Sequence, residues 1–92
     1  MDSKRLYLQR RRRRTLILQA AVGCARLPGG WASLTRAQIA LRAACSPALV
    51  SRCMGNMDAV RKAIMRVAVR QNLTTILSAS RAMHDGYAPP RK

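Results

Sequence analysis

The sequence predicts an all-α fold of three helices followed by one or two C-terminal helices. Apolar residues recur at the three- and four-residue spacing of helix faces, and Pro, Gly and capping residues separate these segments. The chain has 92 residues, of which 49% are hydrophobic, so it suits one domain with a modest core.

The net charge is strongly positive. Lys and Arg total 18 against three acidic residues, which gives a formal charge of +15. Many of the cations lie in residues 1–14, which we predict to be a basic N-terminal arm with its densest run at Arg10, Arg11, Arg12, Arg13 and Arg14. A compact protein seldom keeps such an excess without an anionic partner, so nucleic acid is the first candidate partner and an anionic membrane surface the second.

The first helix is predicted over about 10–26, because Ile17, Ala21 and Cys24 fall on one helical face. Leu27 to Gly30 then ends the helix, since Pro cannot continue it and two glycines permit a turn. The pattern leaves open whether the helix extends back toward residue 7, because five adjacent arginines repel one another.

Two short helices follow, and both have strong start signals. Thr35 is a good N-cap for a helix that must stop near Ala44, ahead of Ser46 and Pro47. Ser46 caps the next helix, from Pro47 to about residue 53, with Val50 on its inner face. Turning by about 100° per residue places Ala48 and Arg52 opposite Val50, with Leu49 and Ser51 on the flanks.

The remaining segments begin at Asn56, a predicted cap after Gly55. Helical spacing continues to residue 83, either as one long helix or with a break near Asn72. We expect residues 15–70 to form the main domain, residues 71–85 a C-terminal helical segment, and residues 86–92 a flexible tail.

Two short helices joined by a tight turn are typical of the helix-turn-helix. In that arrangement the first helix crosses the phosphate backbone and the second enters the major groove of duplex DNA. Only three aromatic residues occur in the chain, which favours duplex over single-stranded nucleic acid. The sequence therefore predicts double-stranded DNA as the partner.

The spacing of these segments resembles the DNA-binding domain of TetR-type repressors. The resemblance covers about residues 14–68 and is carried by the segments 17–21, 30–31, 35–46 and 55–60. Ala44 stands where the family has its turn glycine, so the turn is either strained or of another kind. Ser51 and Met54 replace two aromatic residues, and Met57 replaces a phosphate-contacting lysine.

The short chain has no room for the family's ligand-binding domain, and in this it is similar to the short TetR-like regulators of broad-host-range plasmids. The resemblance implies a cytoplasmic bacterial repressor, associated with the nucleoid through DNA, that binds a palindromic operator without a small-molecule inducer. Whether such a protein represses or activates is not fixed by the residues. The rival prediction is a viral or nucleoid DNA-packaging protein or a terminase-type adaptor, which would show little sequence preference.

Several side chains are candidates for DNA contact. They are Arg10, Arg11, Arg12, Arg13, Arg14, Thr35, Arg36, Ser46, Pro47, Ala48, Leu49, Ser51, Arg52 and Asn56. Arg52 is the main candidate for reading a base, because Arg bonds guanine in bidentate fashion, and a phosphate contact is the alternative. Thr35 and Ser46 can equally be caps and nothing more, and a solvated arm is the alternative interpretation of the arginine run.

Symmetric pairing of two copies is the usual way for a short recognition helix to read enough base pairs. An apolar stripe between residues 71 and 85 exceeds what a three-helix core can cover. We therefore predict a homodimer interface made by Leu73, Ile76, Leu77 and Met83.

The residue types present argue against other classes of function. The three acidic residues are scattered and the one histidine has no nearby nucleophile, so we expect no enzyme. Cys24, Cys45 and Cys53 have no Cys-x-x-Cys spacing, so we expect no metal site and no cofactor, and buried reduced thiols. No stretch approaches the roughly 20 apolar residues of a membrane span. The capped short helices also argue against a helix lying on a membrane.

Overall fold

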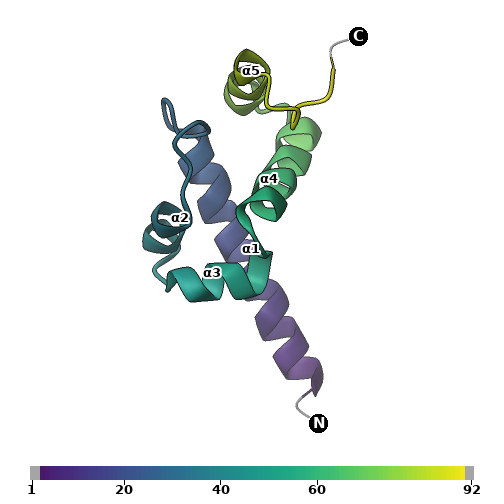
Figure 1. Cartoon of the computed structure of the whole chain (residues 1–92). Helices are drawn as coiled ribbons and strands as arrows, with labels where there is room; N and C mark the ends of the chain where they lie inside the picture. Colours follow the sequence, from purple (N-terminus) through teal and green to yellow (C-terminus); the bar gives the residue numbers. More distant parts are fainter. Residues whose placement is uncertain (1–2, 91–92) are drawn as a thin grey trace.

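Five helices make up the structure, a computed structural model that describes the backbone of residues 3–90 and the side chains of residues 9–90. They are α1 (Ser3–Arg26), α2 (Arg36–Ala43), α3 (Pro47–Met54), α4 (Met57–Gln71) and α5 (Thr74–Met83) (Figure 1). No strand occurs among these residues, so the predicted all-α class is confirmed. Of the two alternatives that the sequence left open for residues 57–83, the break near Asn72 is present, with α4 and α5 as separate helices.

The first helix is longer than its apolar stripe. It begins at Ser3, well before the predicted start near residue 10, and ends at Arg26. The turn after it requires Gly30, because a Cβ there would lie 2.0 Å from the carbonyl oxygen of Cys24. The backbone N–H of Gly30 donates to the carbonyl of Leu27 at 2.7 Å, which closes this turn.

The start of each middle helix is fixed by the residue predicted to cap it. The hydroxyl of Thr35 accepts from the N–H of Gln38, whose side chain accepts from the N–H of Thr35 in return, a capping box. Ser46 caps α3 in the same way by accepting from the N–H of Leu49, and Asn56 caps α4 by accepting from the N–H of Ala59. These local contacts set where the three helices begin.

The turn between α2 and α3 is left-handed at Ala44, with φ 56° and ψ 45°. The N–H groups of Ala44 and Cys45 donate to the last carbonyls of α2, at Leu41 and Ala40. A Cβ disfavours this conformation by roughly 1–2 kcal/mol, so the turn is made at a cost in stability. Of the two turns that the sequence allowed here, the strained left-handed one is present.

Replacing Ala44 with Gly should therefore stabilise the protein. Relief of the left-handed strain is partly offset by the greater freedom of Gly in the unfolded chain, which leaves a gain of about 0.5 kcal/mol. We expect the melting temperature to rise by about 2–4 °C in a thermal melt followed by circular dichroism. The matched control is Ala37→Gly inside α2, which should lower stability by about 0.5–1 kcal/mol. A fall in melting temperature for Ala44→Gly would mean that the left-handed turn is wrong.

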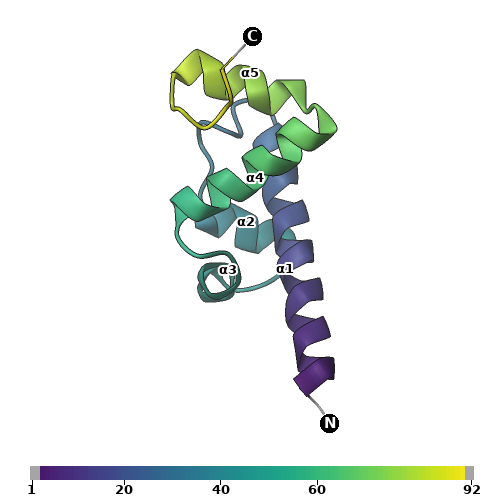
Figure 2. The ribbon, with the colours of Figure 1, turned by 90° about the vertical axis from the view of Figure 1, so that its right-hand side faces the viewer.

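The core lies where α1 crosses the other four helices, each of which contacts it. Its largest fully buried side chains come from the turn after α1 and from α2, α3, α4 and α5, and include Trp31, Ile39, Val50, Ile64 and Ile76. The segment 71–85 is thus part of the same core as residues 15–70, because α5 packs on α4 and α1 (Figure 2).

This packing corrects the predicted dimer interface. Ile76 has no exposed surface and Leu77 is only 7% exposed, so both are already buried within one chain. Leu73 is half-buried against the same core, and only Met83 is largely exposed, at 47%. The apolar stripe of α5 exists because it closes the core of its own chain, and it does not need a second copy to cover it.

The predicted flexible tail also needs correction. Tyr87 packs edge-on against Trp31, with 5.7 Å between ring centroids, and its hydroxyl donates to Asp58 at 2.7 Å. The N–H of Ala88 donates to the hydroxyl of Ser80. Residues 86–88 therefore fold back onto the helices, while residues 91 and 92 of the predicted tail lie outside the described part.

Candidate nucleic-acid interface

Helix α3 presents one face to the core and the opposite face to solvent. Val50 is fully buried and Ala48 and Arg52 are exposed, as the helical spacing predicted, and Pro47 is exposed as well. The flanking residues Leu49 and Ser51 are half-buried. The outer face of α3 is therefore open to solvent in the described part of the chain.

The polar residues at the helix starts lie on the surface. Thr35, Ser46 and Asn56 are all exposed, and each uses a side-chain oxygen to cap a helix. The hydroxyls of Thr35 and Ser46 each keep a proton that could be donated to a phosphate, so capping does not exclude a DNA contact. Arg36, in the first turn of α2, is half-buried, and its Nε has no hydrogen-bond partner.

The arginine run belongs to α1 and does not form a separate arm. Residues 9–16 are all exposed, and the N-terminal turns of α1 project beyond the rest of the molecule in both views (Figures 1 and 2). The boundary predicted after residue 14 is therefore absent from the backbone, because the helix continues through it without a break. What changes near residue 16 is the surroundings of the helix, which passes from solvent into the core.

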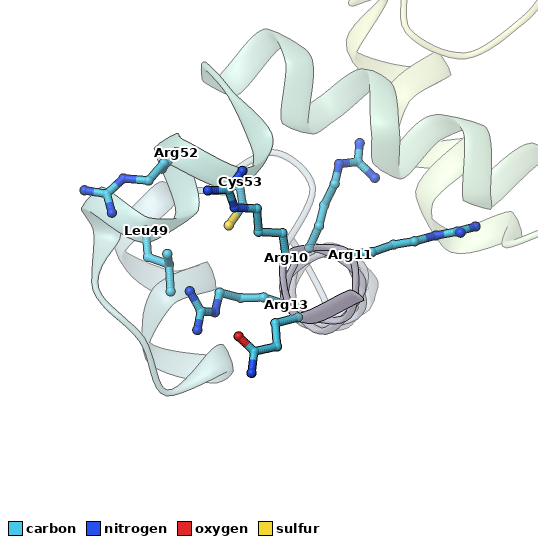
Figure 3. Close-up of a pocket in the computed structure, with 8 residues that line it drawn as sticks. Arg10, Arg11, Arg13, Leu49, Arg52 and Cys53 are labelled. Atoms are coloured by element: carbon cyan, nitrogen blue, oxygen red, sulfur yellow. The ribbon is translucent and has the colours of Figure 1, made fainter. Parts of the chain in front are cut away.

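The exposed half of α1 and α3 together enclose an open hollow of about 1060 Å³. Its lining is Gln9, Arg10, Arg11, Arg13 and Arg14 from α1, and Leu49, Arg52 and Cys53 from α3. We call this hollow the arginine groove. Arg10 and Arg13 reach from α1 toward α3, whereas Arg52 stands on α3 and points away from α1 (Figure 3). Of the five consecutive arginines, only Arg12 does not line the groove.

The acidic side chains of the described residues are held elsewhere. Asp58 forms an ion pair with Lys62 at 3.1 Å and accepts from Tyr87, and neither Asp58 nor Asp85 lines the arginine groove. The hydrogen bond from Tyr87, helped by Lys62, holds the pKa of Asp58 below its ordinary value. The same bond raises the pKa of Tyr87, because it stabilises the phenol form. The arginines in the groove thus have no carboxylate among its lining residues.

Sequence reasoning missed a polar cluster around Asp85, which we call the Trp31 latch. The indole N–H of Trp31 donates to Asp85 at 2.7 Å, and Ser80 and the N–H of Tyr87 donate to the same carboxylate. Burial disfavours the charged form of Asp85, but these hydrogen bonds and nearby Arg61 outweigh it and lower its pKa. Trp31 and Asp85 are 54 residues apart, so no local sequence pattern could have indicated this cluster.

Arg61 completes the Trp31 latch from α4. Its guanidinium lies 4.7 Å from the centre of the Trp31 ring and donates to the carbonyl of Trp31 at 2.9 Å. The latch thereby connects the turn after α1 with α4, α5 and the C-terminal segment. It is a structural cluster and adds nothing to the arginine groove.

Metal binding, cysteine chemistry and membrane insertion are the other possibilities for the described part of the chain. No group of three His, Cys, Asp or Glu side chains within residues 9–90 is placed to hold a metal ion. Cys24, Cys45 and Cys53 are free thiols, with Cys24 buried and the other two half-buried. Within residues 3–90, no helix has both the length and the apolar character needed to cross a membrane.

Comparisons with models of known protein families, with curated proteins and with solved structures found no match. The resemblance to TetR-type repressors therefore stays a prediction from residue spacing.

Proposed function

We propose that this protein is a sequence-specific regulator of transcription that binds double-stranded DNA, with α3 in the major groove. The observation that carries the proposal is the exposed outer face of α3 beside the arginine groove. Helices α2 and α3 are joined by a turn of three residues, which is the length typical of a helix-turn-helix. The formal charge of +15 supports a polyanionic partner.

Binding by two copies to a palindromic operator remains part of the proposal. A helix of eight residues such as α3 spans only about 12 Å, so one copy reads few base pairs. The contact between copies must then use surface other than Ile76 and Leu77, which are buried in the chain. Met83 is still exposed and is the remaining member of the predicted interface that could meet a partner.

The experiment that tests the proposal is selection of duplexes from a randomised DNA pool at near-physiological salt, followed by footprinting. A sequence-specific regulator should enrich one palindrome and prefer it over random duplex by about a thousandfold or more. Enrichment of no sequence, with tight binding to all duplexes, would instead favour a DNA-packaging role. Half-sites centred about one helical turn of DNA apart would support binding by a symmetric pair.

Arg52→Ala should lose preference at one base position in each half-site. Arg52 points outward from α3, and an Arg bound to guanine is typically worth about 1–3 kcal/mol of discrimination. Fluorescence anisotropy on the selected operator and on single-base variants measures this effect. The melting temperature should barely change, because the exposed side chain holds little of the core.

Val50→Ala is the control for that experiment. Val50 is fully buried on the same helix, so its truncation should lower stability by about 2 kcal/mol and affect binding only through folding. Equal loss on operator and random DNA for Arg52→Ala would assign Arg52 to a phosphate. No loss on either would show that α3 is not the reader.

A further inference from the structure

The arginine groove continues the buried face of α1. Ile17, Ala21 and Cys24 lie on the stripe of α1 that packs into the core. Arg10 and Arg14 precede Ile17 and Ala21 by seven residues, or two helical turns, and therefore lie on the same stripe. The face that is apolar where the other helices cover it becomes cationic where they end.

Arg12 lies on the opposite stripe of the same helix. Residues 16 and 19, four and seven positions after it, are both exposed, and Leu16 keeps 56% of its surface accessible. Arg12 accordingly does not line the groove. Neighbouring arginines of one helix thus differ in direction, although they share charge, side-chain length and exposure.

Five arginines gathered around one hollow repel one another unless an anion lies among them. Arg10 and Arg14 are also one helical turn apart, where like charges destabilise a helix by about 0.2–0.5 kcal/mol per pair. The carboxylates of Asp58 and Asp85 are engaged elsewhere, so within the described residues no protein group can supply the counter-charge. The groove is therefore suited to an external anion that carries several negative charges.

Size and chemistry indicate what that anion is. About 1060 Å³ exceeds the space that a single inorganic phosphate would fill, and the hollow is open, as a continuous chain requires. The residues that α1 gives to the groove are one glutamine and four arginines, so this wall has no apolar side chain to insert into a membrane surface. Arginine guanidinium groups are suited to phosphate oxygens, which they bind in bidentate fashion.

We propose that the arginine groove holds one sugar–phosphate strand of duplex DNA, gripped between α1 and α3. The proposal rests on the proposed function, because α3 must lie at the major groove for the strand bordering that groove to pass beside α1. Arg10, Arg13 and Arg14 then bind phosphates of this strand from α1. Arg12 faces away from the strand, so the arginine run acts as one wall of a rigid clamp rather than as a uniformly cationic arm.

Comparison of Arg13→Gln with Arg12→Gln tests this clamp. The two variants remove the same charge from adjacent positions of one helix, and both side chains are exposed, so folding should be unaffected. Removing one arginine–phosphate pair lowers the slope of log K against log salt by about 0.9, which is about eightfold in affinity at 0.1 M salt. We expect the affinity for DNA to fall about eightfold for Arg13→Gln and about sixtyfold for the double variant Arg10→Gln with Arg13→Gln. For Arg12→Gln we expect the affinity to fall by less than about twofold.

The outcomes separate the clamp from the proposed function. The measurement is anisotropy over a salt series, on the selected operator, on random duplex DNA and on duplex RNA of the same sequence. Equal decreases for Arg12→Gln and Arg13→Gln would overturn the clamp but leave sequence-specific binding by α3 intact. Wild-type protein that binds duplex RNA as tightly as DNA would overturn DNA as the occupant of the groove. Wild-type protein that binds no duplex would overturn both proposals.

Discussion

Ile76→Asp is expected to unfold most of the protein. Ile76 is fully buried between α5 and the rest of the core, so the substitution removes a large apolar side chain and places a carboxylate there without a partner. Loss of a buried Ile side chain alone costs about 2–5 kcal/mol, and an unpaired buried charge adds several more. Because a domain of this size is stable by only about 5–15 kcal/mol, little folded protein should remain.

Urea denaturation followed by tryptophan fluorescence measures this effect, since Trp31 is the one tryptophan and is buried. The matched control is Met83→Asp on the same helix, where the side chain is 47% exposed and the charge stays in water. Met83→Asp should change stability by less than about 1 kcal/mol. If Ile76→Asp instead folded normally and only weakened association between copies, the burial of α5 within one chain would be wrong.

Trp31→Ala should be almost as damaging, with a loss of about 3–5 kcal/mol in the free energy of unfolding. The indole ring is 1% exposed and packs against Tyr87 and under the guanidinium of Arg61. Its removal opens a cavity and leaves the carboxylate of Asp85 without one of its donors. Urea denaturation followed by circular dichroism gives the change in stability without relying on tryptophan fluorescence, which this variant lacks.

Trp31→Phe divides that effect between packing and hydrogen bonding. Phenylalanine keeps an aromatic ring in the site but has no N–H for Asp85, so we expect a loss smaller than that of Trp31→Ala. A Trp31→Phe protein as stable as wild type would show that the hydrogen bond to Asp85 contributes nothing. DNA binding by folded Trp31→Phe should be unchanged, because the Trp31 latch is separate from the arginine groove.

The starts of the middle helices could be predicted from the sequence because they depend on local contacts. Thr35, Ser46 and Asn56 each cap a helix by a bond to a backbone N–H three residues later. Gly55 adopts φ 88°, a conformation that side chains oppose, so a break there is readable from the residue type alone. The direction of Val50 and Arg52 on α3 follows equally from the turn per residue of a helix.

What only the tertiary structure decided is which distant segments meet. The apolar stripe of α5 has the same pattern whether it packs on its own chain or on a second copy, so the sequence could not assign Ile76. Asp85 lies 54 residues from Trp31, so no local sequence pattern predicts the hydrogen bond between their side chains.

The role of the arginine run is also a tertiary matter. The sequence by itself determined its charge and helical spacing, because both depend on residue type and order. Where the core ends along α1, and hence which arginines face α3, depends on how far the other helices extend beside it. That is set by long-range packing, which leaves Arg10 and Arg13 lining a groove and Arg12 facing solvent.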